Sequence, residues 1–383
     1  MASNRVLWLL LVLMTGALIF LPLVNLAPNR LVSGTPLMVW SPGAVVLWLL
    51  APLLGLWGLC LLAPGRNGLI LLCCQLLFTC ALWMLGQLAD QLMQHSGSLA
   101  RVTPGSGWWV VLAGSLLGAM DASQRLTPRP LYRLALNLQI WLLPVLMLAG
   151  GCFSATSLLR EYHNRADVFQ AALAGHLLYL PGVLVPGLLI ALPAGWWCQR
   201  SARARRTLLP LLNIIQTVPS VALFGLLIAP LTRLAQRFPV LGEWGISGIG
   251  LAPALVALVL YSLLPLVRGV MSGLDAVPAR VTESARGMGM SRGQLAWRVE
   301  LPLALPVLLR SLRVVAVQTT GLAVVAALIG AGGLGTLIFQ GLLSSAMDLV
   351  LLGVIPTVAL AVVVDTVFRC LLALVEESPG DRI

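Results

Sequence analysis

The chain has 383 residues, of which 59% are hydrophobic and only 10% are charged, and its mean hydropathy is +0.96. A soluble domain carries about 25% charged residues, so this composition excludes a water-soluble globule and indicates a protein that lies in a lipid bilayer. All 24 basic residues are arginine, because the chain contains no lysine. A P-loop nucleotide site and a Schiff-base enzyme both need a lysine, so neither chemistry is expected of this chain.

The formal net charge of +11 suggests nucleic-acid binding, a function that needs basic side chains clustered among groups that read bases. The distribution of arginine between alternate loops, described below, explains the charge better. The seven cysteines lie mostly within apolar runs and form no framework of spaced pairs, so we interpret them as core residues. His95, His163 and His176 have no Cys, Asp or Glu at metal-ligand spacing. The sequence therefore predicts no metal, no cofactor and no nucleic-acid partner.

Long apolar runs dominate the chain, and a spanning helix needs about 20 apolar residues. The runs are continuous rather than alternating, so they predict an all-α polytopic membrane protein and not a barrel. The predicted spans, about ten, cover residues 6–27, 44–63, 69–89, 108–120, 134–151, 177–198, 208–230, 249–267, 303–330 and 349–374. A cleaved signal peptide is the alternative for the first run, although that run is longer than a signal core.

Arginine is distributed unevenly between alternate loops. With the N-terminus inside, 18 of the 24 arginines fall on the cytoplasmic side and the remaining 6 on the other side. Cytoplasmic loops are enriched in arginine, so both termini are expected in the cytoplasm. We expect a five-span region of unknown role over residues 1–160, a second membrane domain over 161–375 and a cytoplasmic tail over 376–383.

The most informative segment is the predicted cytoplasmic loop over residues 271–302. Pro278 suits the first position of a short helix. Val281, Ala285 and Met288 then recur at helical spacing, which predicts that they share one apolar face.

A turn and a second short helix are expected to follow. Gly287 and Gly289 are expected to end the first helix and to form the turn, because glycine adopts the left-handed conformation common at helix ends. Ser291 and Gln294 have the spacing of a capping box, which starts a helix. Pro302 is expected to end that helix, because proline lacks an N–H donor and disfavours helix in its predecessor.

Seven residues of this loop resemble the signature of the inner-membrane subunits of bacterial ABC importers. In that signature Glu-Ala-Ala is followed by a glycine, then by an apolar residue, one spacer and Leu-Pro; here Ser replaces one Ala and Val replaces the usual Ile. The residues at the signature positions are Glu283, Ser284, Ala285, Gly289, Val299, Leu301 and Pro302, of which Ser284 and Val299 are the two departures. The resemblance implies that this loop couples the chain to a separate cytoplasmic ATPase and carries no catalysis itself.

The resemblance covers residues 171–374, and segments 215–227, 283–290 and 327–343 are similar to the osmoprotectant branch of these importers. With its five extra N-terminal spans, the whole chain resembles the YehY-type glycine betaine uptake permeases. This resemblance implies a MetI-like permease core that works by alternating access. It also implies three kinds of partner: cytoplasmic ABC ATPase subunits, an extracytoplasmic substrate-binding protein, and a second permease subunit that is identical or related.

Polar residues interrupt the seventh predicted span. Gln216, Thr217, Pro219 and Ser220 place polar side chains and a helix breaker at membrane depth. We interpret them as candidates for lining the solute path, as the resemblance implies for this span. The alternative is a proline kink that neighbouring groups repair locally.

Two further features have competing interpretations. The string GAGGLG at residues 330–335 fits a dinucleotide fingerprint, but an apolar spanning run precedes it where the fingerprint requires a strand, so close helix packing and a break are favoured. Asp365 lies within the last predicted span, where a carboxylate is a functional candidate. Arg369, one turn later, favours a structural ion pair over proton coupling.

The alternative function is an ion-coupled secondary carrier, because ten spans are compatible with two inverted repeats. The coupling loop and the lack of paired carboxylates within the predicted spans argue against it. A membrane enzyme is a third candidate, weakened by the absence of a nucleophile–base pair or metal constellation in the sequence. The sequence therefore predicts a non-catalytic permease subunit that imports a small osmoprotectant such as glycine betaine.

Overall fold

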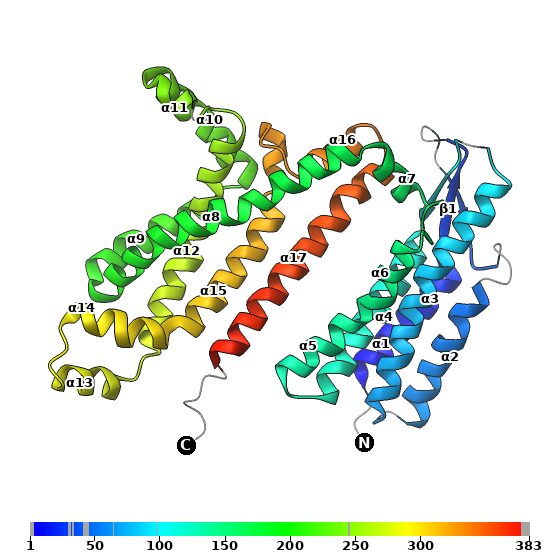
Figure 1. The fold of residues 1–383 in the computed structure, drawn as a ribbon, viewed down its shortest axis with the longest axis horizontal. Coiled ribbons are helices and arrows are strands. Elements are labelled where there is room, and N and C mark those ends of the chain that lie inside the picture. Colours follow the sequence, from blue (N-terminus) through cyan, green and yellow to red (C-terminus); the bar gives the residue numbers. More distant parts are fainter. Residues whose placement is uncertain are drawn as a thin grey trace. The chain divides into compact units, whose positions relative to one another are not determined.

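The computed structural model describes residues 4–29, 32, 34–40, 46–63, 65–97, 99–243 and 246–376. Of the predicted C-terminal tail, residues 377–383 lie outside this set. The chain divides into two compact units, Met1–Asn164 and Arg165–Ile383, here called unit 1 and unit 2 (Figure 1).

Unit 1 is a helical bundle with a small sheet at one end. A 3-10 turn, Gln139–Trp141, joins its fifth and sixth helices. The elements in chain order are α1 (Arg5–Phe20), β1 (Val24–Ala27), β2 (Thr35–Leu37), α2 (Leu47–Leu62), α3 (Asn67–Gln94), β3 (Arg101–Pro104), α4 (Ser106–Leu126), α5 (Pro130–Leu138), α6 (Leu142–Ala149) and α7 (Ser157–Asn164).

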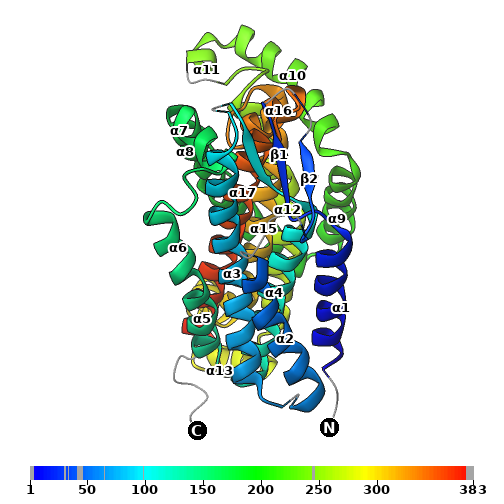
Figure 2. The same cartoon turned by 90° about the vertical axis from the view of Figure 1, so that its right-hand side faces the viewer.

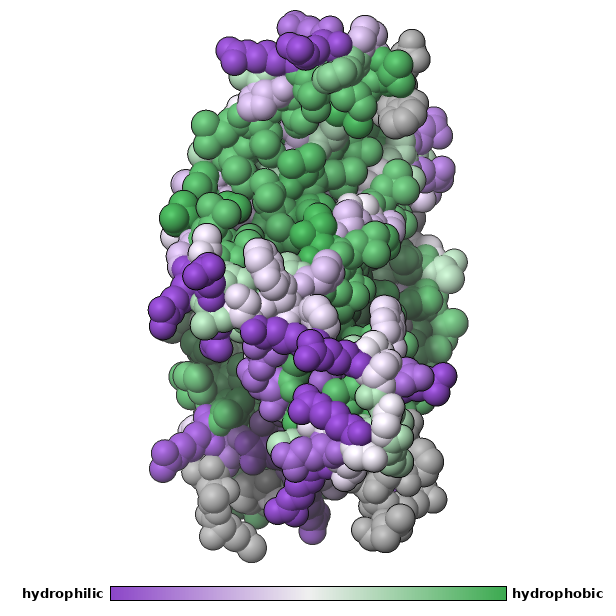
Figure 3. Space-filling view, turned by 90° about the vertical axis from the view of Figure 1, so that its left-hand side faces the viewer, coloured by the Kyte–Doolittle hydropathy of each residue, from purple (hydrophilic) through white to green (hydrophobic). Residues whose placement is uncertain are grey.

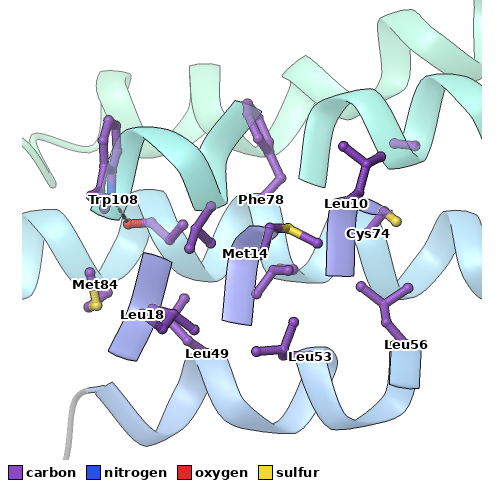
Figure 4. Packing of buried hydrophobic residues seen from close by; sticks show 14 of the residues in the cluster. Leu10, Met14, Leu18, Leu49, Leu53, Leu56, Cys74, Phe78, Met84 and Trp108 are labelled. Carbon is purple, nitrogen blue, oxygen red and sulfur yellow. Dashed lines mark hydrogen bonds between the residues drawn. The ribbon is translucent and has the colours of Figure 1, made fainter. Parts of the chain in front are cut away.

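The core of unit 1 lies between α1, α2, α3 and α4. Met14 of α1, Leu53 of α2 and Phe78 of α3 point into it (Figure 4). Trp108 of α4 is also buried, and its indole Nε1 donates a hydrogen bond of 2.7 Å to the Ala81 carbonyl (Figure 4). This bond satisfies the polar atom of a large ring inside an apolar core.

The three strands of unit 1 form an antiparallel sheet in the order β2-β1-β3, with β1 and β2 side by side in Figure 2. The first predicted span, residues 6–27, is therefore wrong in its last part. The helix stops at Phe20 because Leu21 is extended, with φ −115° and ψ 148°, as the residue before Pro22 tends to be. The all-α prediction missed the sheet, since a short buried strand and the end of a helix have the same apolar composition.

Unit 2 contains the long helices of the second half and the predicted loop. Its α-helical backbone is interrupted by a π-helical turn, Ala296–Glu300, and by a 3-10 turn, Val325–Ile329. The helices are α8 (Ala166–Arg200), α9 (Ala202–Thr217), α10 (Ser220–Arg237), α11 (Pro239–Glu243), α12 (Leu251–Asp275), α13 (Ala279–Gly287), α14 (Arg292–Leu295), α15 (Leu301–Leu322), α16 (Gly335–Leu343) and α17 (Met347–Glu376).

Helix α12 is the centre of unit 2 and packs against both α8 and α15. Two glycines permit these contacts. A Cβ atom added at Gly195 of α8 would lie 2.6 Å from Cβ of Val270, and one added at Gly269 of α12 would lie 2.1 Å from Oγ of Ser311. Such small residues allow helix backbones to approach closely, which is how helices associate when water does not drive them together.

Each of the ten predicted runs contains helix, but not every run is long and apolar enough to cross a bilayer alone. Five helical segments of the described chain meet that condition, or six if the bent pair α9 and α10 counts as one span. Helices α1 and α2 have 16 residues each, about 24 Å at 1.5 Å per residue, whereas the hydrocarbon core is about 30 Å thick. By helix length and composition, the described chain therefore contains fewer membrane spans than the ten that the sequence predicts.

Candidate functional site

The predicted loop folds as two short helices joined by a turn at Gly289. After α13 the N–H of Gly289 donates to Arg286 O at 2.9 Å, and the N–H of Met290 donates to Ala285 O at 3.3 Å. These two bonds form a Schellman motif, which requires a left-handed residue between the helix and the following chain. Gly289 has φ +79°, as that position demands, whereas Gly287 keeps a negative φ as the last residue of α13.

The capping box that was predicted for the second helix is present. The N–H of Gln294 donates to Ser291 Oγ at 3.3 Å, and the N–H of Ser291 donates to Gln294 Oε1 at 2.9 Å. The prediction that this helix ends before Pro302 is wrong. Helix α14 runs through the π-helical turn, where Leu301 N–H bonds to Ala296 O, and directly into α15. Pro302 is the second residue of α15 and directly follows the wider π-helical turn.

The two helices of the loop bury few side chains within this chain. Ala285 and Leu295 are each 2% exposed, whereas Met288 is 71% and Trp297 is 72% exposed. The predicted apolar face of Val281, Ala285 and Met288 is therefore only partly covered, because Met288 lies beyond the last residue of α13. The loop presents exposed apolar side chains on a backbone fixed by local hydrogen bonds.

The residues of the importer signature lie along this loop and into α15. Glu283, Ser284, Gly289 and Pro302 are exposed. Val299 and Leu301 are partly buried, and Ala285 is buried. The structure thus brings the signature residues onto one continuous helix-turn-helix.

The candidate path residues lie at a sharp break between two helices. Helix α9 ends at Thr217 and α10 begins at Ser220, and the two are bent by 105°. Gln216 Nε2 donates to Tyr261 O at 2.9 Å, and Thr217 Oγ1 donates to Ile214 O at 2.7 Å. Pro219 is exposed at the break.

A third hydrogen bond ties α12 to the same break, because the Tyr261 hydroxyl donates to Val218 O. The Gln216 side chain therefore donates a hydrogen bond to a backbone carbonyl group of α12. The Tyr261 hydroxyl donates one to a backbone carbonyl group at the break between α9 and α10. Thr217 and Pro219 are exposed, and Gln216 and Ser220 are half-buried. A proline kink whose backbone groups are hydrogen-bonded by neighbouring side chains accounts for these bonds. Lining of the solute path by the exposed residues stays a prediction.

The glycine-rich string follows helical backbone and forms an irregular connection between α15 and α16. Gly330, Gly332 and Gly333 have φ values of +74°, +78° and +81°. The element directly before it is the 3-10 turn Val325–Ile329, whereas the dinucleotide interpretation would require a strand there. The prediction of a break at this string is correct.

Two side chains of α8 form hydrogen bonds to this connection and to the end of α15, and no local sequence pattern predicts them. His176 is buried, and its Nε2–H donates to Thr320 O at 3.1 Å. Tyr179 is also buried, and its hydroxyl donates to Ala331 O at 2.7 Å. His176 looks isolated in the sequence because its partner lies 144 residues away.

The carboxylate of Asp365 pairs with two arginines. Arg369 Nε lies 2.7 Å from Asp365 Oδ2, one turn along α17, as the sequence predicted. Arg313 Nε of α15 lies 2.5 Å from Asp365 Oδ1, which the sequence did not predict. Both oxygens are occupied by guanidinium groups, so the structure favours the ion-pair interpretation over a proton-coupling site.

Comparison with known proteins gives family matches over both halves of the chain. Residues 4–159 match the family described as the ABC transporter permease YehY N-terminal domain, and residues 187–378 match the binding-protein-dependent transport system inner membrane component. The permease chain of the inward-facing methionine ABC transporter MetNI has the same fold over 55% of this chain and 98% of its own, with TM-score 0.50 and 24% identity.

Curated relatives match about half of this chain. The osmoprotectant import permease protein OsmW of Salmonella typhimurium is 37% identical over 198 residues, 51% of this chain and 87% of its own length. The glycine betaine/carnitine/choline permease protein OpuCB of Bacillus subtilis is 32% identical over 212 residues, 53% of this chain and 90% of its own. The chain therefore belongs to the family of binding-protein-dependent transport system inner membrane components, and is a multi-pass, non-catalytic permease subunit of an ABC importer.

Proposed function

We propose that this permease imports a small osmoprotectant such as glycine betaine. The relatives named above carry osmoprotectant, glycine betaine, carnitine or choline in their names, and their similarity covers the half of the chain that holds the permease core. A permease of this family works with an ABC ATPase and a substrate-binding protein. The comparisons offer no support for the ion-coupled carrier.

The coupling loop, residues 271–302, is the contact for the ATPase. The observation that carries this role is a helix-turn-helix fixed by a Schellman motif and a capping box, with Met288 and Trp297 exposed. A rigid element with exposed large apolar side chains suits a protein partner, because those residues gain burial on binding without ordering a flexible loop. Helix α14 continues into α15 without a stop, so a push on the loop passes directly into a membrane helix.

The path residues and the arrangement of subunits complete the proposal. Gln216, Thr217, Pro219 and Ser220 would face the solute path, which two permease subunits, identical or related, would enclose. Both termini and the coupling loop would face the cytoplasm of a bacterium, as the distribution of arginine favours. Residues 1–160 would form a separate membrane region and residues 161–375 the permease domain.

Purification from native membranes in mild detergent tests the partners. The tagged chain should bring down an ATPase, and a second permease sequence in the same fraction would define the pair as related rather than identical. Recovery of the chain without any ATPase would contradict the role of the loop.

Reconstitution into liposomes tests the energy source and the solute. With its ATPase and binding protein, uptake of radiolabelled glycine betaine should require ATP and should persist when ion gradients are collapsed. Choline and carnitine serve as competing solutes, and alanine, which lacks a quaternary ammonium group, is the control. Uptake driven by a sodium or proton gradient without the ATPase would refute the proposal.

A further inference from the structure

A pocket of about 490 Å³ lies where the coupling loop meets the end of α8. Ligand pockets are typically about 300–1,000 Å³, so this one has room for a small polar group. The pocket is lined by the last residue of α8, the end of α13, the turn that follows α13, helix α14 and the end of the π-helical turn before α15. The lining residues are Arg200, Arg286, Met290, Arg292, Leu295 and Glu300.

The charge of this pocket is not balanced. Arg200 is held in place, because its Nη2 lies 3.3 Å from Glu300 Oε2 and its guanidinium lies 3.8 Å from the centre of the Trp196 ring. Arg286 and Arg292 are exposed and form no ion pair within the described part of the chain. Three guanidinium groups against one carboxylate leave two positive charges unneutralised.

The pocket lies at the boundary between an apolar and a polar surface. Trp196 and Trp197 precede Arg200 at the end of α8, and both rings are substantially exposed, by 40% and 59%. Tryptophan followed by arginine is typical of the interface between hydrocarbon and headgroups. On the face of unit 2 in Figure 3, a strongly hydrophilic band lies directly below a broad hydrophobic surface.

We propose that this pocket binds the phosphate headgroup of an anionic phospholipid, with Arg286 and Arg292 as the principal ligands. The planar guanidinium group matches phosphate oxygens in a bidentate manner, and basic pockets beside membrane helices recognise anionic headgroups. The exposed tryptophans provide an apolar border for the lipid chains. A zwitterionic lipid brings its own cation, so two unneutralised arginines favour the anionic class.

The position of the pocket gives the lipid a structural role. A headgroup there would contact α8, the end of α13 and the start of α14 together, and would hold the coupling loop against the membrane helices. This consequence rests on the proposed function of the loop. Binding itself does not, so the first experiment measures binding on the chain without its ATPase.

Native mass spectrometry of the purified chain measures lipid retention after exposure to phosphatidylglycerol or phosphatidylcholine. We expect preferential retention of phosphatidylglycerol, and retention on the order of ten-fold weaker in the double variant Arg286→Gln, Arg292→Gln. Arg280→Gln is the matched control, because Arg280 is an exposed arginine of α13 that does not line the pocket. The charge-preserving double variant Arg286→Lys, Arg292→Lys should bind between the levels of the wild type and the glutamine double variant, because it keeps the charge and loses the bidentate geometry.

Equal retention of the two lipids, or equal loss in the double variant and the Arg280→Gln control, would overturn the proposal. Competition by millimolar inorganic phosphate alone would assign the pocket to a free phosphate and not to a lipid. If the arginines instead bind acidic side chains of the ATPase, the double variant should lose ATPase association while its lipid retention is unchanged, and this result would also overturn the proposal.

A second measurement connects binding to transport. In liposomes with ATPase and binding protein, uptake should rise with the fraction of phosphatidylglycerol in the wild type and in Arg206→Gln, whose exposed arginine lies in α9 outside the coupling loop and does not line the pocket. In the double variant it should stay at the level of pure phosphatidylcholine liposomes. Unchanged lipid dependence in the double variant would show that the pocket does not act on the coupling loop.

Discussion

Replacement of Gly289 by valine isolates the contribution of one backbone position to coupling. Gly289 has φ +79°, and no atom lies within 4 Å of a Cβ added there, so the substitution introduces no clash. The cost is purely conformational, on the order of 1–3 kcal/mol for a β-branched residue in the left-handed region. That cost disfavours the Schellman turn by a factor of roughly 5 to 150.

The predicted result is uncoupling without loss of the protein. The turn lies outside the membrane helices, so Gly289→Val should insert and accumulate normally while ATPase association and ATP-driven uptake fall together. Gly287→Ala is the matched control, because Gly287 has a negative φ and the same open surroundings. Gly289→Asn should restore much of the activity, since asparagine tolerates the left-handed conformation.

The assay is co-purification of the ATPase with each variant at matched abundance, followed by uptake in liposomes. Glu283→Ala should weaken both quantities less, because it removes one exposed charge and leaves the turn intact. Normal uptake and normal ATPase recovery with Gly289→Val would refute the assignment of residues 271–302 as the coupling element.

Labelling tests the orientation that the arginine distribution predicts, and two substitutions test individual side-chain contacts. In a cysteine-free background, Arg280→Cys should resist an impermeant thiol reagent in intact cells while Ser247→Cys reacts; the reverse pattern would contradict the orientation. Tyr179→Phe should lower the free energy of unfolding by about 1 kcal/mol, because it removes the bond to the Ala331 carbonyl, and a thermal-shift assay in detergent would show no change if that bond contributes nothing. Asp365→Asn should destabilise the protein by on the order of 2 kcal/mol, more than Arg369→Gln, because it leaves two arginines unpaired, and equal melting temperatures would refute this order.

Local signals predicted the coupling loop well, because a capping box and a glycine at a helix end depend only on neighbouring residues. The same reasoning failed at Pro302, since a π-helical turn shifts the hydrogen bonding before the proline is reached. The family of the chain was recognisable from the same loop, whose signature residues are close together in the sequence.

Long-range partners were not predictable from the sequence. Arg313 and Asp365 are 52 residues apart, and no local pattern indicates that they meet. Strand β1 was hidden in the first apolar run, because hydrophobicity alone does not distinguish a buried strand from a continuing helix. The basic pocket was also missed, because Arg200 reaches Glu300 only through the fold.

The hydrogen bonds from α8 to both sides of the glycine-rich connection have a mechanical consequence. His176 and Tyr179, three residues apart, fasten the last turn of α15 and the chain before α16 to one helix. The ends of α8, α15 and α16 are therefore expected to move as one body during transport. A change of the 105° angle between α9 and α10 would instead have to break the hydrogen bonds that Gln216 and Tyr261 make between this joint and α12, so these two bonds are expected to limit motion of α10 relative to α12.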